Sequence, residues 1–482
     1  MSYLTELQKA TNKGTTENGC ATNISSLNPC LDFFALGAAK RARPEEAASL
    51  FKKAYAKDKT TALRTLFYIR DVRGGQGERD IFRACMEELD AFDIENAQKV
   101  YKFIPEYGRW DDLLYHRPAS PIAVQIVKDQ LEKDLKSDNP SLLGKWLPSQ
   151  NTSSKVTRLA GKNWAIALGY TPKEYRKMLS KLRKKIHLLE QDMSEKKWGE
   201  IEYDKVPSQA HRKHVKAFVR NDGTRYKKYL DEVKNGGKKL NTSTVTTTEV
   251  IANVRSLSVK ELDNTEETAV NTIWDSLDDV IPKDLNGIVV ADVSGSMYSG
   301  KPRPLDISVS LALYFAERNK GTFANKFLTF SENPRLVEVR GETLTQKLDN
   351  IETADWGMNT NIERTFDCLL QAAVASGDTE NIPKVIYIIS DMEFDTCVTG
   401  ASETAFENAR RKWNEKGLEL PTVVFWNVQS RGNNLPATKF DKNVVLISGN
   451  NQNAFRFAFE GKTPEDLMLE VVNSDRYKQI VI

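Results

Sequence analysis

From residue 286 to the C-terminus, short apolar runs alternate with stretches of helical spacing. The runs are GIVVAD (287–292), NKFLTFS (325–331), RLVEV (335–339), KVIYIISD (384–391), PTVVFWNV (421–428) and NVVLIS (443–448). Helical stretches occur at 304–319, 360–376, 402–417 and 463–474. Continuous apolar strands that alternate with helices are typical of a mostly parallel sheet covered on both faces. We therefore expect a doubly wound α/β domain over residues 286–482, with ligands bound beyond the carboxyl ends of its strands.

Residues 30–235 show helical spacing and almost no strand signal. The clearest helix is predicted at 171–193, where Thr171 and Glu174 have the spacing of a capping box. Its apolar stripe comprises Tyr175, Met178, Leu179, Leu182, Ile186 and Leu189. The Thr-rich residues 236–248 are predicted to be a loop or linker. We expect a HEAT-like helical array over residues 1–248, joined to the α/β domain by a helical segment at 249–285.

Length and composition exclude several classes of protein. A chain of 482 residues is expected to form two or three domains. It has no apolar run of membrane-spanning length, and its polar N-terminus lacks a secretory pattern. The five scattered cysteines do not suggest a disulfide framework or a zinc site. These features predict a protein of the reducing cytoplasm with no membrane role.

Oxygen-bearing side chains follow two of the predicted strands. Asp292, Ser294 and Ser296 come directly after the first strand, and Asp391 closes the strand at 384–390. Thr360 begins the helical stretch at 360–376. Carboxylates and hydroxyls without Cys or His suit Mg²⁺ or Mn²⁺. The alternative is that Asp292 and the serines only cap a turn, which leaves Asp391 unexplained.

The D-x-S-x-S pattern at 292–296 resembles a von Willebrand factor A domain with a metal-ion-dependent adhesion site. The resemblance implies that Ser294, Ser296 and Thr360 coordinate the metal directly. It also implies that Asp292 and Asp391 act mostly through water, and that an open coordination position accepts an acidic group from a partner.

A helical array followed by such a domain is similar to the plan of the Ro autoantigen, or TROVE, proteins. In those proteins helical repeats form a ring closed by the metal-site domain, and the ring binds structured and misfolded non-coding RNAs. Phrases such as TENG (16–19), NPCLDFF (28–34) and IRDVRGGQGERDIF (69–82) resemble an uncharacterised family with the same architecture.

Positive charge is concentrated in residues 173–239, which contain 20 lysines and arginines against 10 aspartates and glutamates. Clustered cations bind phosphates, and interleaved aromatic residues such as Phe218, Tyr226 and Tyr229 can stack on exposed bases. The alternative is a solvated helix face. The candidate nucleic-acid-binding residues are Arg176, Lys177, Lys181, Arg183, Lys184, Lys185, Arg212, Lys213, Lys216 and Arg220.

Taken together, these features predict an RNA-binding scaffold of Ro-like plan with one Mg²⁺ site. RNA is preferred to DNA only because of the Ro resemblance. The alternative function is a protein-binding adaptor whose metal captures a partner carboxylate, with no nucleic-acid role. No histidine follows His214, so the α/β domain cannot contain a Ser-His-Asp triad. We therefore expect a binding protein rather than an enzyme.

Overall fold

The protein is represented by a computed structural model that describes residues 2–115, 119–186, 188–256, 263–330, 333–352, 361–395, 403–457 and 459–482. Between residues 30 and 235 every regular element that the structure describes is helical, as the spacing predicts. A short antiparallel hairpin, β1 (Lys13–Thr15) and β2 (Ala21–Asn23), precedes this region. The helices are α1 (Tyr3–Ala10), α2 (Pro29–Leu36), α3 (Pro44–Lys57), α4 (Lys59–Arg70), α5 (Arg79–Phe92), α6 (Ile94–Val100), α7 (Ile104–Tyr107), α8 (Trp110–Leu114), α9 (Pro121–Lys136), α10 (Leu143–Trp146), α11 (Lys155–Leu168), α12 (Pro172–Ile186), α13 (Leu189–Ser194), α14 (Ser208–Lys234), α15 (Thr247–Ser256) and α16 (Asn264–Asp275).

The C-terminal part forms the expected α/β domain. Its strands are β3 (Gly287–Asp292), β4 (Lys326–Phe330), β5 (Leu336–Glu338), β6 (Val385–Ser390), β7 (Thr422–Asn427) and β8 (Val444–Ser448). Its helices are α17 (Pro304–Arg318), α18 (Leu344–Glu352), α19 (Ile362–Ser376), α20 (Ala405–Glu415) and α21 (Pro464–Val472). All six predicted strands are present, which confirms the predicted fold class of a helical array followed by an α/β domain.

The strand order β5-β4-β3-β6-β7-β8 makes this a doubly wound sheet. All neighbouring strands are parallel except β4 and β5, which are antiparallel. The chain builds outward from β3 through β4 to β5, and then returns to the other side of β3 with β6. The carboxyl ends of β3 and β6 therefore lie next to each other where the strand order reverses, which is the usual ligand position in such sheets.

Both faces of the sheet are covered. Every residue of β3, β6, β7 and β8 is buried. On β7, Phe425 packs against Phe406 of α20, with ring centroids 6.3 Å apart. The next residue, Trp426, points to the opposite face and packs against Phe455 at 4.9 Å. Burial on both faces explains why these strands are continuously apolar in the sequence.

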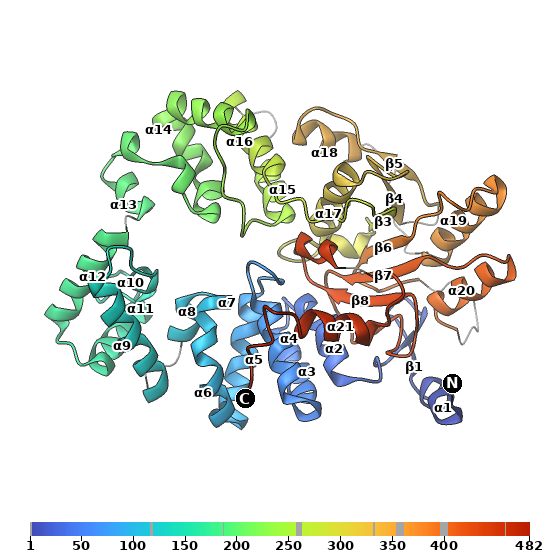
Figure 1. The fold of residues 1–482 in the computed structure, drawn as a ribbon, viewed down its shortest axis with the longest axis horizontal. Helices are drawn as coiled ribbons and strands as arrows, with labels where there is room; N and C mark the ends of the chain where they lie inside the picture. Colours follow the sequence, from blue (N-terminus) through green and yellow to red (C-terminus); the bar gives the residue numbers. More distant parts are fainter. Residues whose placement is uncertain are drawn as a thin grey trace.

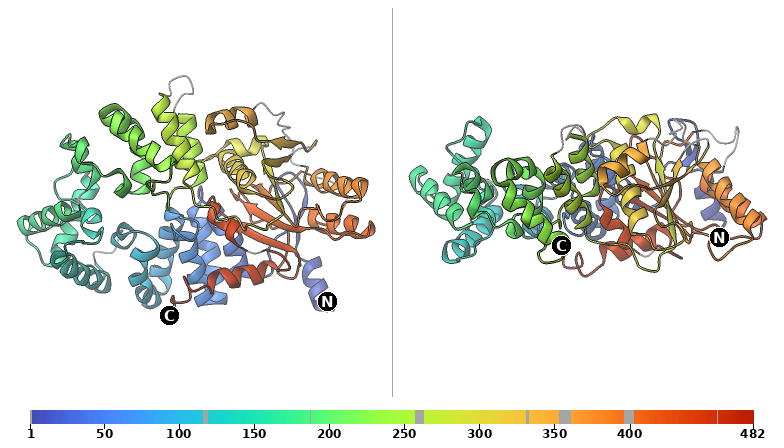
Figure 2. Two further views of the ribbon diagram at one scale, coloured as in Figure 1. Left: turned by 45° about the horizontal axis from the view of Figure 1, so that its top comes forward. Right: turned by 90° about the horizontal axis from the view of Figure 1, so that it is seen from above.

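The helical region contacts the α/β domain at both of its ends. At its start, α2 packs against β8 and α21, and α4 also packs against α21. At its end, α15 packs against α17 and α16 against α18. Between these two attachments, α6 to α13 form an arc that extends away from the sheet (Figure 1). Seen from above, α9 to α13 lie at the opposite end of the molecule from α1 (Figure 2).

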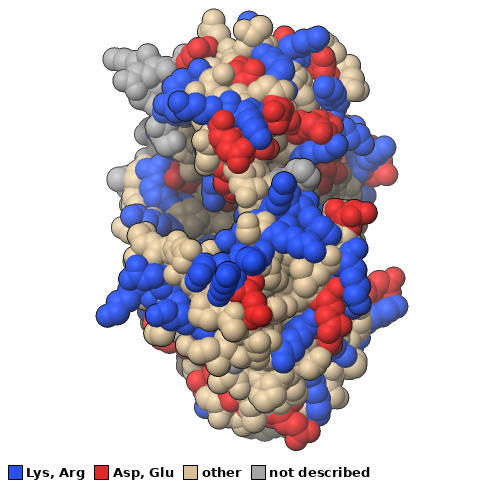
Figure 3. Space-filling model, turned by 90° about the vertical axis from the view of Figure 1, so that its left-hand side faces the viewer, with Lys and Arg blue, Asp and Glu red and all other residues tan. Residues whose placement is uncertain are grey.

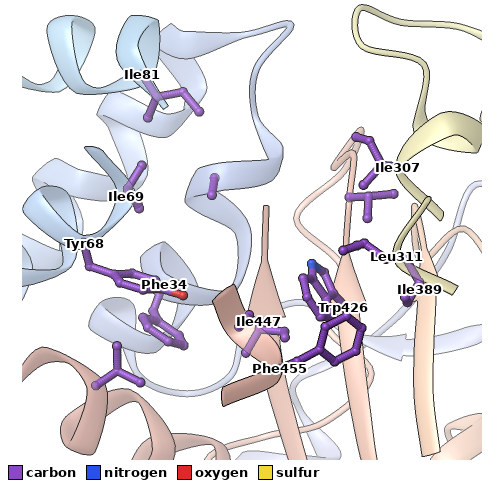
Figure 4. Close-up of a cluster of buried hydrophobic side chains, with 14 of the residues drawn as sticks. Phe34, Tyr68, Ile69, Ile81, Ile307, Leu311, Ile389, Trp426, Ile447 and Phe455 are labelled. Carbon is purple, nitrogen blue, oxygen red and sulfur yellow. The ribbon is translucent and has the colours of Figure 1, made fainter. Parts of the chain in front are cut away.

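One hydrophobic core runs through both regions. Phe34 of α2 stacks on Tyr68 of α4 at 5.4 Å, and Tyr68 contacts Phe457 of the C-terminal part at 6.4 Å. Figure 4 shows Phe34 and Tyr68 on one side of this cluster and Trp426 and Phe455 on the other. The helical array and the sheet are therefore stabilised by a shared buried surface.

Residues 236–246 form a loop, as predicted, Thr247 and Thr248 begin α15, and the loop is packed against neighbouring elements. Leu240 and Val245 are buried. The Thr242 hydroxyl donates to the carbonyl of Ser276 at 2.7 Å, and Gln452 donates to the carbonyl of Val245 at 3.1 Å. The threonine and backbone groups that suggested a polar loop are satisfied by neighbouring elements.

Within the described ranges, no helix is long and apolar enough to cross a bilayer. Cys20, Cys30, Cys85 and Cys368 form no disulfide among the described residues, and Cys397 lies outside them.

The buried carboxylate of Asp71 links α4 to the C-terminal segment. It accepts hydrogen bonds from Arg476 (Nη2, 2.6 Å) and from the hydroxyl of Tyr477 (2.8 Å). Asp71→Asn leaves the guanidinium without its charge partner, so we expect the free energy of unfolding to fall by about 2–4 kcal/mol. Urea denaturation would measure this loss.

Asp475→Asn is the matched control, because Asp475 is 94% exposed and its ion pair is with Lys478. That change should stay within about 0.5 kcal/mol of wild type. Equal effects of the two substitutions would contradict the proposed link.

Candidate functional site

The structure brings Asp292 and Asp391 to the carboxyl ends of adjacent strands. Ala291 of β3 is paired with Ile389 of β6, so Asp292 and Asp391 follow in neighbouring positions. Both carboxylates are buried, with 0% and 1% of their surface exposed. After Asp292 the chain enters a short 3-10 turn at Gly295–Tyr298, which brings Ser296 back towards Ser294. The parallel sheet therefore places Asp292 beside Asp391, with Ser294 and Ser296 on the turn that follows Asp292, while Thr360 lies outside the described residues.

Hydrogen bonds fix the orientation of the Asp292 carboxylate. Oδ1 accepts from the backbone N–H of Ser294 at 2.9 Å, and Oδ2 accepts from the hydroxyl of Ser390 at 2.6 Å. The hydroxyls of Ser294 and Ser296 lie 3.1 Å apart and share a hydrogen bond. The alternative interpretation, that Asp292 only caps the turn, explains the hydrogen bond at Oδ1 but not the one that Ser390 donates to Oδ2. Each carboxylate oxygen can accept a second bond, so both can still face a cation or its water.

Asp391 is held by different partners. Its Oδ1 accepts from the backbone N–H of Glu393 at 3.2 Å. Its Oδ2 accepts from Arg431 at 2.6 Å, and the same guanidinium donates to Glu17 at 3.2 Å. Arg431 lies on the segment after β7, and Glu17 lies between β1 and β2. No spacing in the sequence indicated either residue, although Glu17 belongs to the TENG phrase.

The electrostatics of the pair suit a cation. Burial, followed by the negative charge of Asp391, raises the pKa of Asp292 above its usual value, although hydrogen bonds from Ser294 and Ser390 oppose this shift. A divalent ion would relieve the repulsion between two buried carboxylates. Within the described ranges, no three Asp, Glu, His or Cys side chains come together in a metal-binding arrangement. A hard cation at this position would have two carboxylates and neighbouring hydroxyls as its protein ligands.

Three of the ten predicted nucleic-acid-binding residues are engaged inside the protein. Arg183 donates to Gly144 O, Ser149 Oγ and Leu147 O, at 3.0, 2.7 and 2.8 Å. Lys185 donates to the carbonyls of Leu135 and Ser137 at the end of α9, at 3.3 and 2.7 Å. Arg212 joins α14 to α15 through Asn253 (2.8 Å) and Glu249 (3.3 Å).

The other seven predicted nucleic-acid-binding residues are exposed. They have no ion pair or side-chain hydrogen bond with the described part of the chain. They are Arg176, Lys177, Lys181, Lys184, Lys213, Lys216 and Arg220. Figure 3 views the end of the molecule formed by α9 to α14, where lysines and arginines gather beside a hollow.

A pocket of about 580 Å³ opens beside α12 at this end of the molecule. Four cationic side chains line it, together with polar amides and hydroxyls and no carboxylate. The lining residues are Ser149, Gln150, Asn151, Lys173, Arg176, Lys177, Leu179, Ser180, Arg183 and Gln191. Such a lining suits an anionic ligand with polar groups.

The expectation that Phe218, Tyr226 and Tyr229 are available for stacking is wrong. All three rings are buried, with exposed fractions of 4% or less. They pack with Tyr203 and His211 in one aromatic cluster. Burial lowers the pKa of His211 to about 4, so this imidazole is neutral at physiological pH and adds no positive charge.

We expect Arg183→Gln to lower the free energy of unfolding by about 1–3 kcal/mol, because the carbonyls of Gly144 and Leu147 lose their donors. Lys177→Gln on the same helix should change stability by less than about 0.5 kcal/mol, because Lys177 is exposed. Thermal and urea denaturation would measure both. A loss in Lys177→Gln as large as that in Arg183→Gln would contradict the division between structural and surface cations.

Two family models match the chain. Residues 286–479 match a model described as Domain of unknown function (DUF7788). Residues 16–91 and 167–284 match a model described as Domain of unknown function (DUF2828).

One curated relative is similar over most of its length. The Uncharacterized protein L728 of Acanthamoeba polyphaga mimivirus is 31% identical over 478 residues, which cover 90% of this chain and 82% of that protein. A crystal structure of the Deinococcus radiodurans RO (RSR) protein matches 91% of this chain and 92% of that chain, with 12% identity and a TM-score of 0.38. A TM-score this low does not by itself define a shared fold.

Proposed function

The chain belongs to the family that includes protein L728 of Acanthamoeba polyphaga mimivirus, and we propose that it is an RNA-binding scaffold. The surface of α12 and α14 binds the RNA. The observation that carries the proposal is the set of seven exposed cations on these two helices, which form no ion pair with the residues that the structure describes. Unpaired cations gain more from phosphate than cations already engaged with carboxylates, because they lose no existing partner.

The pocket beside α12 supports the same function. Lys173, Arg176 and Lys177 can bind phosphates there, and the side-chain amides of Gln150 and Asn151 can donate to or accept from polar groups of a base. Since the nearby aromatic rings are buried, recognition by this surface depends on charge and hydrogen bonds rather than on stacking. The choice of RNA over DNA rests on the resemblance of the two-part plan to the Ro proteins.

Replacing Arg176, Lys177, Lys181 and Lys184 together by Gln should weaken binding to structured RNA across many sequences. Lys185 is left in place because it caps α9. If the four cations contact phosphates of single-stranded segments of the RNA, the slope of log affinity against log salt should flatten by about 2–3 units, at about 0.7 per contact. Gel-shift titrations at several salt concentrations would measure the slope.

A control variant removes the same charge elsewhere. Its four substitutions are Lys283→Gln, Lys320→Gln, Lys384→Gln and Lys416→Gln, all at exposed positions outside α12 and α14. This variant should keep its affinity and its salt slope. An equal loss in both variants would mean that only net charge matters, and unchanged binding in the α12 variant would reject this surface.

A second function is favoured by the buried pair of Asp292 and Asp391. We propose that these carboxylates, with Ser294 and Ser296, bind Mg²⁺ or Mn²⁺, and that the metal accepts an acidic group of a partner. The bound ion would supply a positive centre with an open coordination position. The hydrogen bonds from Ser390 to Asp292 and from Arg431 to Asp391 hold the two carboxylates in place. We propose binding rather than catalysis at this site.

Asp292→Asn and Ser296→Ala should each weaken Mn²⁺ binding by about 10- to 100-fold or more, because the first removes a carboxylate charge beside the ion and the second removes a hydroxyl ligand. Asp284→Asn, an exposed carboxylate just before β3, is the control and should bind as wild type. Titration followed by electron paramagnetic resonance measures affinity, and circular dichroism confirms folding. Unchanged affinity in both site variants would rule out this metal site.

A further inference from the structure

The TENG segment, residues 16–19, lies across the loop that follows β6 at the rim of the candidate metal site. The chain from Asp391 to Asp395 forms this loop. The contacts are Thr16 Oγ1 to Phe394 O (2.6 Å), Glu17 N to Glu393 Oε2 (2.8 Å), Asn18 Nδ2 to Glu393 O (2.8 Å) and a β-bridge between Gly19 and Asp395. The backbone of the TENG segment is therefore fixed beside the two carboxylates.

Arg431 connects this segment to the site. Its Nη2 donates to Oδ2 of Asp391 at 2.6 Å, and its Nη1 donates to Oε2 of Glu17 at 3.2 Å. The side chain of Asp391 is 1% exposed, that of Arg431 is 28% exposed and that of Glu17 is 53% exposed. One guanidinium thus lies between a buried carboxylate of the site and a half-exposed carboxylate of the TENG segment.

The main chain on both sides of Arg431 is anchored. The backbone N–H of Ser430 donates to the carbonyl of Ala39 at 3.1 Å, and Lys40 donates to the carbonyl of Gly432 at 2.6 Å. The position of the guanidinium near Asp391 is therefore set by the fold.

A guanidinium bound to Asp391 and a metal ion near Asp391 compete for the same negative charge. Glu17 affects this competition because it accepts a hydrogen bond from the same guanidinium that binds Asp391. We propose that Arg431 is an internal cation that weakens metal binding at Asp391, and that Glu17 limits this effect by drawing on the same guanidinium. The inference rests on the metal site proposed above. It assigns the TENG segment a role in setting the metal affinity.

The two substitutions have opposite expected signs. Arg431→Gln removes the competing charge, so Mn²⁺ should bind about tenfold more tightly or better, in line with the 1–3 pKa units that a neighbouring opposite charge is worth. Glu17→Gln leaves the guanidinium to Asp391 alone, so Mn²⁺ should bind about two- to fivefold more weakly, as expected for a partly exposed ion pair. Damage to the fold would weaken binding in both variants.

The double variant separates an action through Arg431 from a direct action of Glu17. If Glu17 acts only through the guanidinium, Glu17→Gln has no further effect in the Arg431→Gln background. If Glu17 instead attracts or ligates the metal itself, the double variant binds more weakly than Arg431→Gln, and the inference is overturned.

The experiment is a Mn²⁺ titration of the full chain followed by electron paramagnetic resonance. Lys13→Gln removes the ion pair of β1 with Glu407 (2.7 Å) without touching Arg431, and should bind Mn²⁺ as wild type. Arg431→Lys keeps the charge and should stay close to wild type. Equal affinities of wild type and Arg431→Gln overturn this inference and leave the metal site intact. Absence of Mn²⁺ binding in wild type overturns the metal site, and this inference with it.

Discussion

The parallel pairing of β3 with β6 is the interaction on which the candidate metal site depends. The two strands meet where the strand order reverses, so no crossover helix lies between their carboxyl ends. Their residues are buried on both faces, and a slip by one residue would exchange the side chains packed against the two sides of the sheet, so close packing fixes the register. Asp292 and Asp391 are held as a close buried pair because the packing of apolar residues around them determines where each strand ends.

The sheet and the pair of Asp292 and Asp391 could both be predicted because both follow from local sequence patterns. Asp292 and Asp391 each close a continuous apolar run, and such runs are strands buried on both faces. Arg431 and Glu17 could not be predicted, because their contacts join segments far apart in the chain and no local pattern marks a cation that binds a distant carboxylate. The antiparallel direction of β5 also depends on pairing rather than on local sequence.

The basic helices show where charge patterns mislead. Arg183 and Lys185 look like surface cations in the sequence, yet both donate to carbonyls of neighbouring segments, and only the tertiary structure supplies those acceptors. The aromatic residues of α14 could have been interpreted correctly. His211 and Phe218 recur at helical spacing on one face, which is the pattern of a core stripe, and Tyr226 joins them after the non-helical Asp222 interrupts α14. The alternation of these aromatic residues with cations indicates an amphipathic helix whose aromatic side is buried, rather than exposed rings that stack on bases.

The contact between the TENG segment and the loop after β6 also sets an order of assembly. Glu17 and Glu393 are separated by 376 positions. At a synthesis rate of about 5–20 residues per second, the N-terminal hairpin waits roughly 20–75 s on the ribosome for its partners to be made. The rim of the candidate metal site is therefore among the last parts to form, and a ribosome that stalls before residue 393 releases a protein in which this rim cannot form.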